Sequence, residues 1–259
     1  GRTARGTAMI NILPLEAGES VTAMVVTREF HEDEYLMMVT RNGTVKRIPF
    51  IALATRRRTG IRAITLEEGD QLINVMRTNG DDNIILATAN GMAICFNEND
   101  VRPMGRNASG VKGITLQGDE DEVIGMLCVE NMTDNILVVS EKGYGKRSNL
   151  EEYRITNRGG KGVKTINITD KTGQLIAITN VTDENDLMII NKSGIVIRMK
   201  VSDLRVLGRA TQGVRLINLR ETDEIASITK VDTEEETTDE IEVVDSEVLN
   251  TTNNNALDE

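Results

Sequence analysis

Residues 110–116 read Gly110-Val111-Lys112-Gly113-Ile114-Thr115-Leu116, a glycine followed by alternating apolar and polar side chains. Such alternation is typical of a β-strand, in which successive side chains point to opposite faces. The same pattern begins at four other glycines, which are Gly6, Gly60, Gly162 and Gly213. Because the glycines recur at intervals of roughly 50 residues, the chain is an array of similar structural units.

Each repeat contains further segments in a fixed order. An acidic turn and a second apolar strand follow the glycine strand, the second strand at residues 21–26, 72–76, 123–129, 175–181 and 225–231. A third apolar strand follows at residues 36–40, 84–88, 136–140 and 187–190. A turn that contains a glycine then leads into a fourth strand. The turn glycines are Gly43, Gly91, Gly143 and Gly194. Glycine permits the positive φ of tight turns, so we expect the third and fourth strands to form hairpins.

Four strands per repeat, rich in β-branched residues and without helical periodicity, predict an all-β fold of propeller blades. A single blade cannot bury its faces alone, so neighbouring blades must stack in a ring. We expect about five to six four-stranded blades in a domain of residues 1–231, with repeats starting near residues 1, 55, 105, 157 and 208. The fifth repeat stops after its second strand, near Val231. This suggests a fragment, and it leaves open whether the ring closes with strands upstream of residue 1.

The formal net charge of −11, from 30 basic and 41 acidic residues, is unevenly distributed. Residues 221–259 hold fourteen of the acids and one of the bases, which leaves 29 bases and 27 acids in residues 1–220. The apolar pattern ends after Val231, and a segment of this composition cannot offset the entropy cost of ordering by burial. We therefore expect residues 232–259 to form a disordered acidic tail on a nearly neutral body.

The bases of the body recur at fixed places in the repeat, which predicts a belt of positive charge along one edge of the ring. Acidic residues are nearly absent from these positions, and the acidic turns should gather at another edge. Evenly spaced bases suit the evenly spaced phosphates of a DNA duplex, and an aromatic content of 2% disfavours single strands. At any single position, a solvated strand face is the alternative explanation. The candidate DNA-binding residues are Lys46, Arg47, Arg57, Arg58, Arg62, Arg106, Lys112, Lys146, Arg147, Arg158, Lys161, Lys164, Arg198, Arg209 and Arg215.

The sequence indicates no catalytic or metal centre. His31 lies among acids, and Cys95 and Cys128 are far apart without a histidine partner, so we expect no zinc site. The glycines at 159–162 are not followed by the Lys-Ser/Thr and helix of a phosphate-binding loop. No apolar run approaches the length of a membrane span. We expect no cofactor and no catalysis in this chain itself.

Four segments closely resemble the family of DNA gyrase A C-terminal domains. They are residues 104–114, 141–147, 208–217 and the run Arg158-Gly159-Gly160-Lys161-Gly162-Val163-Lys164-Thr165. The resemblance covers about residues 1–231 and implies a β-pinwheel, a propeller-like ring whose blades exchange strands with their neighbours. It further implies that the basic rim wraps duplex DNA and supports ATP-dependent negative supercoiling by a type II topoisomerase. An acidic tail that modulates the wrap is known in the family, and residues 232–259 resemble one.

The resemblance also implies partners and a location. The partners would be double-stranded DNA, the breakage-reunion domain of gyrase A and the gyrase B subunit, in an A2B2 holoenzyme. ATP and magnesium would belong to that holoenzyme rather than to this chain. The location would be the bacterial cytoplasm, in association with the nucleoid.

The chain departs from the family pattern at its N-terminus. The family's domain has six blades, and the first carries a box of sequence Gln-(Arg/Lys)-Arg-Gly-Gly-Lys-Gly, whereas residues 1–7 read Gly-Arg-Thr-Ala-Arg-Gly-Thr. The run at 158–162 lacks the preceding Gln, so the resemblance carries DNA contact to it but not the role of the box. With fewer repeats and no box, the DNA-bending C-terminal domain of topoisomerase IV is one alternative. The repeat architecture leaves a protein-binding propeller scaffold as another.

Overall fold

The computed structural model describes residues 6–8, 11–13, 15–16, 18–55, 57, 60–129, 134–220 and 222–232. The expected tail lies outside them except for Asp232, which ends the last strand. The elements are strands and short 3-10 helices, and this confirms the all-β class. No helix in the described part of the chain is long and apolar enough to cross a membrane.

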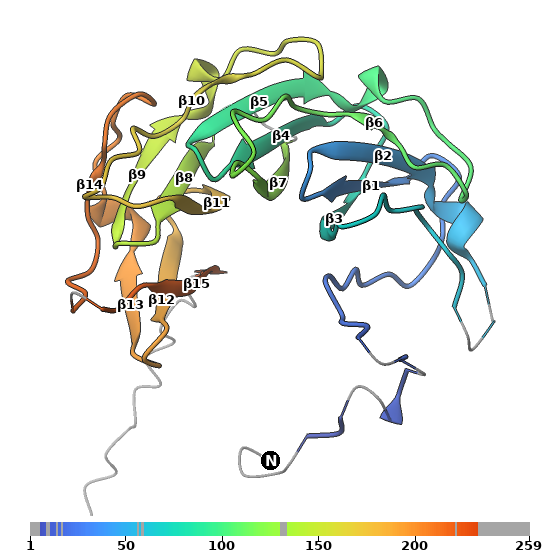
Figure 1. Cartoon of the computed structure of the whole chain (residues 1–259), viewed down its shortest axis with the longest axis horizontal. Helices are drawn as coiled ribbons and strands as arrows, with labels where there is room; N and C mark the ends of the chain where they lie inside the picture. Colours follow the sequence, from blue (N-terminus) through green and yellow to red (C-terminus); the bar gives the residue numbers. More distant parts are fainter. Residues whose placement is uncertain are drawn as a thin grey trace, which may run out of the picture.

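Four β-hairpins form the centres of the sheets, one from each of the first four repeats (Figure 1). Each turns at the predicted glycine, where φ lies between 78° and 86°. The hairpins are β1 (Tyr35–Thr40) with β2 (Thr44–Pro49), β4 (Asn83–Thr88) with β5 (Met92–Asn97), β8 (Asn135–Ser140) with β9 (Tyr144–Asn149), and β12 (Asn185–Asn191) with β13 (Val196–Lys200). A 3-10 helix follows each hairpin: η2 (Phe50–Leu53), η3 (Glu98–Asp100), η4 (Leu150–Glu152) and η5 (Val201–Asp203).

The other strands leave their own repeat and pair with hairpins of earlier repeats. The second strand joins the hairpin one repeat earlier, which pairs β3 (Leu72–Thr78) with β1, β7 (Val123–Val129) with β4, β11 (Leu175–Val181) with β8, and β15 (Ile225–Asp232) with β12. The glycine strand reaches back two repeats, which pairs β6 (Val111–Lys112) with β2, β10 (Val163–Lys164) with β5, and β14 (Val214–Arg215) with β9. The expected exchange of strands between blades is therefore confirmed.

The sheets follow one another in a curved arc. Figure 1 shows β3, β7, β11 and β15 on the inner side of the arc and β6, β10 and β14 on its outer side. The described residues form four sheets rather than the expected five to six, and the last sheet, β13-β12-β15, has three strands. Strand exchange explains the difference, because each sheet is centred on a hairpin and the repeats supply four hairpins.

Two predicted strands near the N-terminus do not form. Residues 21–26 belong to no strand, and Val21, Met24 and Val26 are exposed at 44%, 76% and 82%. The glycine strand that begins at Gly60 joins no sheet either. In later repeats the equivalent segments pair with hairpins one or two repeats earlier, and the described residues contain no hairpin before β1. A strand without a neighbour cannot satisfy its backbone hydrogen bonds in a sheet.

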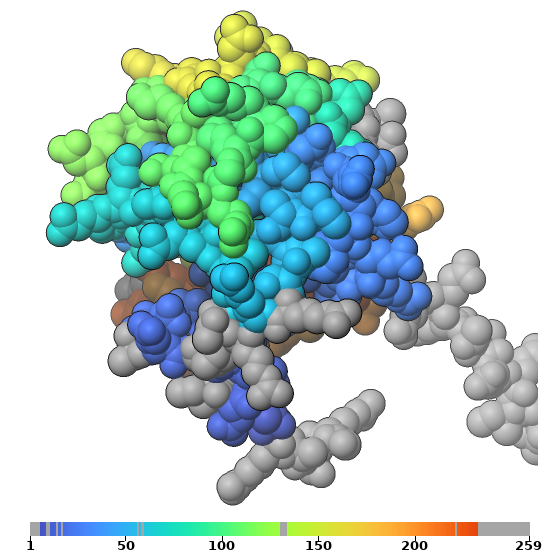
Figure 2. Space-filling view, turned by 90° about the vertical axis from the view of Figure 1, so that its right-hand side faces the viewer, coloured from blue at the N-terminus to red at the C-terminus, as the bar shows by residue number. Residues whose placement is uncertain are grey.

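The repeat glycine is required where an outer strand approaches the hairpin. Gly162 has φ of 73°, and a Cβ atom there would lie 2.2 Å from the carbonyl oxygen of Ala93. A Cβ at Gly110 would lie 2.5 Å from the carbonyl oxygen of Val45. Figure 2 shows the green segment that contains β6 lying against the blue and light-blue part of the first sheet.

Apolar clusters fill the spaces between neighbouring sheets. One joins Met37 and Val39 of the first sheet to Ile84, Leu86 and Phe96 of the second. Two further clusters join the second sheet to the third and the third to the fourth. Stacked sheets therefore share their cores, and this fixes the outer strands relative to one another.

Candidate nucleic-acid interface

Three predicted bases stand at the same place on three consecutive sheets. Lys112, Lys164 and Arg215 are the second residues of β6, β10 and β14, and all three are exposed. Each lies opposite the first residue of a hairpin strand, in the pairs Lys112 with Thr44, Lys164 with Met92, and Arg215 with Tyr144. The repeat therefore places these charges at regular intervals along the outer side of the arc.

Two loop arginines connect neighbouring outer strands. The guanidinium of Arg158 donates hydrogen bonds to the carbonyl oxygens of Asp100 at 2.9 Å and of Lys112 at 2.8 Å. The guanidinium of Arg209 donates to the carbonyl oxygen of Lys164 at 2.9 Å. Because these acceptors are neutral, the bonds orient the two guanidinium groups without neutralising their charge.

Several other predicted bases are exposed. They are Arg57, Arg62, Arg106, Lys161 and Arg198, whereas Arg58 lies outside the described residues. Lys161 and Arg154 line a cavity of about 310 Å³ between β5 and the loop of residues 154–163. Arg198 is already paired, since its Nε lies 2.6 Å from Asp186 Oδ2.

Four predicted bases lie in the interior instead. Lys46 and Lys146 are fully buried, and Arg47 and Arg147 are 4% and 7% exposed. Burial lowers the pKa of the Lys46 ammonium and lowers the pKa of Lys146 to about 8. These four side chains are therefore not accessible for the predicted contact with DNA.

The buried arginines have partners in their own repeat and in the next one. Arg47 Nη1 lies 3.2 Å from Glu98 Oε2, and its guanidinium lies 4.3 Å from the ring centre of Tyr35. Arg147 donates to the carbonyl oxygen of Leu204 at 2.6 Å and pairs with Asp183. Alternation along a strand does not say which face is buried, so the pattern alone could not separate these bases from exposed ones. The sequence of the second repeat did indicate burial at these positions, because the apolar residues Ile94 and Cys95 occupy them there.

Two further residues of the outer side were missed by the sequence analysis. Tyr144 accepts a hydrogen bond from Arg215 Nη2 at 2.9 Å, and the ammonium of Lys171 lies 5.4 Å from the centre of its ring. The bond from Arg215 lowers the pKa of Tyr144. Lys171 belongs to an acidic turn, so its position in the repeat did not indicate a basic neighbour for Arg215.

The acidic turns have a structural role that the charge pattern did not reveal. One aspartate in each of three turns accepts a hydrogen bond from the hairpin of the repeat before, at or next to its turn. The bonds run from Asn42 N to Asp70 at 3.0 Å, from Asn90 N to Asp121 at 3.0 Å, and from Asn191 Nδ2 to Asp223 at 2.6 Å. Part of the acidity of the body therefore connects successive repeats.

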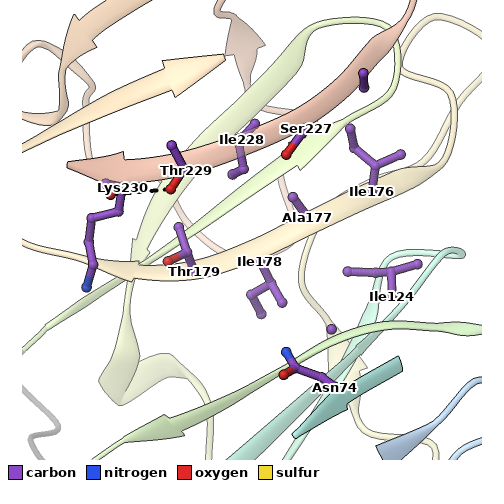
Figure 3. Close-up of a pocket in the computed structure, with 12 residues that line it drawn as sticks. Asn74, Ile124, Ile176, Ala177, Ile178, Thr179, Ser227, Ile228, Thr229 and Lys230 are labelled. Carbon is purple, nitrogen blue, oxygen red and sulfur yellow. Dashed lines mark hydrogen bonds between the residues drawn. The ribbon is translucent and has the colours of Figure 1, made fainter. Parts of the chain in front are cut away.

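The inner side of the arc has a different chemistry. A cavity of about 470 Å³ lies among β3, β7, β11 and β15, and Figure 3 shows Ile124, Ile176, Ile178 and Ser227 around it. Lys230 is the one charged side chain among its lining residues. Nowhere in the described ranges do three or more His, Cys, Asp or Glu residues form a possible metal site.

Comparison with known proteins identifies the repeat. A sequence model of the family described as "DNA gyrase C-terminal domain, beta-propeller" matches residues 1–28, 34–79, 82–130, 134–182 and 185–232. Each of the last four matched segments contains one hairpin and the inner strand that pairs with it. The family's unit is therefore the unit around which each sheet is built.

Relatives and solved structures agree with this match. The DNA gyrase A protein of Staphylococcus aureus strain MRSA252 is 41% identical over 243 residues, and that of strain NCTC 8325 is 42% identical. Each alignment covers 92% of this chain and 27% of the relative, so the chain spans about a quarter of the curated relatives that it matches.

Two solved structures share the fold. The C-terminal domain of DNA topoisomerase IV matches with a TM-score of 0.81 and 25% identity, over 88% of this chain and 71% of that one. The DNA gyrase A C-terminal domain matches with a TM-score of 0.78 and 23% identity, over 88% and 76%. Because the five segments that the family model matches cover most of the chain, the chain belongs to the DNA gyrase C-terminal domain family.

Proposed function

We propose that the chain is the DNA-wrapping module of a DNA gyrase A protein and binds duplex DNA along the outer side of its arc. The observation that supports this most strongly is the equivalent placement of Lys112, Lys164 and Arg215 on three consecutive sheets. Regularly spaced charges on a curved edge match the phosphates of a bent duplex. Contacts to phosphates carry no sequence information, so binding is independent of sequence.

Bending the duplex has an energetic cost that the outer bases must offset. By elastic estimates, a site of about 20–30 bp costs roughly 1–6 kcal/mol to bend. The stacked sheets hold the outer strands in place, and Arg158 and Arg209 are already oriented by their bonds to Lys112 and Lys164. A rim whose bases are ordered before binding loses less entropy when it contacts DNA.

In the holoenzyme, the wrap presents a nearby DNA segment for strand passage, which results in ATP-dependent negative supercoiling. The partners in this proposal are the breakage-reunion domain of gyrase A and the gyrase B subunit, in the bacterial cytoplasm. ATP and magnesium bind to the holoenzyme outside this chain. Family membership and the similarity to the Staphylococcus aureus gyrase A proteins support this proposal.

A salt titration of duplex binding tests the proposal. The logarithm of the binding constant should fall linearly with the logarithm of salt concentration, by about 0.9 for each phosphate neutralised. The double variant Lys112→Ala/Lys164→Ala should reduce that slope by about 1.8. Arg77→Ala/Lys230→Ala is the matched control, because it removes two exposed bases from the inner strands β3 and β15. A slope near zero for the unmodified chain, or equal losses in both double variants, would refute the proposal.

The DNA-bending domain of topoisomerase IV is the second candidate, favoured by the TM-score of 0.81 with that enzyme's C-terminal domain. The two candidates differ in what the holoenzyme does to relaxed plasmid. A holoenzyme that carries this domain should introduce negative supercoils if the first proposal is right. Relaxation or decatenation without negative supercoiling would favour the second.

A further inference from the structure

The buried ammonium of Lys46 binds the backbone of two other repeats. Its Nζ donates hydrogen bonds to the carbonyl oxygens of Ala63 at 2.7 Å, Arg106 at 2.8 Å and Ala108 at 2.8 Å. These three acceptors use all three protons of the ammonium. Arg106 and Ala108 belong to the loop of residues 102–109, which precedes the outer strand β6. One side chain of the first hairpin therefore holds the loop that carries an exposed base.

Lys146 makes the corresponding contact two repeats later. It lies on β9 three residues after the turn glycine Gly143, as Lys46 lies on β2 three residues after Gly43. Its Nζ donates to the carbonyl oxygen of Gly208 at 2.5 Å. Gly208 directly precedes Arg209 in the loop of residues 205–211, which leads to β14.

The other two hairpins lack this contact, and the loop over the second is held without a lysine. Ile94 and Ile197 occupy the equivalent positions. Beneath the loop of residues 154–163, a cavity of about 310 Å³ lies beside Ile94. That loop is held by its own Arg158, as the loop of residues 205–211 is by Arg209, and by Thr115 Oγ1, which donates to the carbonyl oxygen of Gly159 at 2.6 Å.

A buried ammonium has a high desolvation cost, and an apolar side chain of similar size packs at least as well. The isoleucines of the second and fourth hairpins show that the fold accepts one at this position. What the lysine adds is a further fixed position for carbonyl groups of a loop with little regular structure, which also pairs with the hairpin through an isolated bridge such as Arg47 with Pro103 and through the bond from Met104 N to the carbonyl oxygen of Arg47. The contact therefore sets loop geometry more than it adds stability.

We propose that Lys46 and Lys146 are positioning residues, which hold the loops of residues 102–109 and 205–211 so that Arg106 and Arg209 lie where the outer rim binds phosphates. This inference rests on the proposed DNA-binding function. Neither ammonium contacts DNA itself, because both are fully buried.

The test is a double-mutant cycle between Lys46 and Arg106, measured as duplex affinity in the full chain at about 0.1 M salt. Arg106→Ala should weaken binding about eightfold, the value of one phosphate contact at that salt concentration. Lys46→Met, which keeps the length of the side chain, should weaken binding to a similar extent. The double variant should be no weaker than either single variant, because both remove the same contact. Additive losses, or unchanged affinity in Lys46→Met, would overturn the proposal.

Amide hydrogen exchange provides a readout that does not depend on DNA. Lys46→Met should speed exchange in residues 102–109 and leave the core strands unchanged. If the chain binds no DNA but this local change occurs, the proposed function fails and the loop contact stands. Ile94→Leu is the control, and it should change neither affinity nor exchange. Should Lys46→Met fail to fold, the cycle of Lys146→Met with Arg209→Ala applies the same criteria to the third hairpin.

Discussion

Arg47 and Glu98 form a buried ion pair between neighbouring sheets, with Arg47 Nη1 3.2 Å from Glu98 Oε2 and side chains that are 5% and 0% exposed. Glu98 also accepts hydrogen bonds from Thr78 Oγ1 at 2.7 Å and from the backbone N–H groups of Gly80 and Asp82, both at 2.8 Å. One carboxylate therefore connects β2 and β3 of the first sheet with the turn before β4 and the helix after β5.

Glu98→Ala should destabilise the domain by about 3–5 kcal/mol, because it leaves the guanidinium of Arg47 buried without its anion. The free energy of unfolding from urea titration measures the loss. Glu120→Ala removes an exposed carboxylate and should change stability by less than about 0.5 kcal/mol. Similar losses in both variants would contradict the role assigned to Glu98.

The hairpins could be predicted because the sequence pattern that specifies each one is local. An apolar strand, a glycine turn and a second strand specify one another over about fifteen residues, and all four hairpins appear at the predicted turns, from Gly43 to Gly194. The number of sheets could not be obtained in the same way. A period gives the order of the strands, but it does not say whether a strand such as β6 pairs within its own repeat or two repeats earlier.

The candidate site shows the same limit at the level of single side chains. The belt positions Lys112, Lys164 and Arg215 follow from spacing, since equivalent residues of a repeat occupy equivalent places. Lys46 and Arg47 also lie on a hairpin strand, yet both are buried, because the loop before β6 covers Lys46 and Glu98 of the next repeat covers Arg47. Burial there depends on contacts between segments that are about sixty residues apart, as in the bond from Lys46 to Arg106.

Gly162→Ala should destabilise the domain by more than about 2 kcal/mol, because it combines a positive φ with a steric clash. The φ of 73° disfavours any side chain, and the new Cβ would lie 2.2 Å from the carbonyl oxygen of Ala93. Thermal denaturation followed by circular dichroism measures the change. Gly105→Ala is the matched control, since nothing lies within 4 Å of its Cβ position and its φ lies outside the left-handed region. A loss at Gly162 no larger than at Gly105 would show that β10 does not pack on β5 as described.

Cys95 should resist thiol reagents in the folded domain. Its side chain is 3% exposed, and burial raises the pKa of the thiol to about 11. At pH 8 about one molecule in a thousand would carry the reactive thiolate, and access would limit its reaction further. In a Cys128→Ser variant, maleimide labelling should be slow in buffer and complete in denaturant, as measured by mass spectrometry. Rapid labelling in buffer would mean that the second sheet opens on the timescale of the reaction.

The buried Lys146 should make stability depend on pH above about 8. Burial is the main cause of its lowered pKa, which the carboxylate of Glu152 opposes and the guanidinium of Arg209 supports. Its pKa is about 8 in the folded state against an ordinary value of 10.5, so between these values the unfolded chain binds more protons. Below pH 8 the folded state bears the full cost of burying the charged ammonium. As the pH rises towards 10.5 this cost disappears, so the folded state becomes more stable relative to the unfolded chain. The urea midpoint should therefore rise with pH relative to that of Lys146→Met, whereas the exposed Lys142→Met should show no such trend. A constant difference between the unmodified chain and Lys146→Met from pH 7 to 10 would mean that the Lys146 ammonium is solvated.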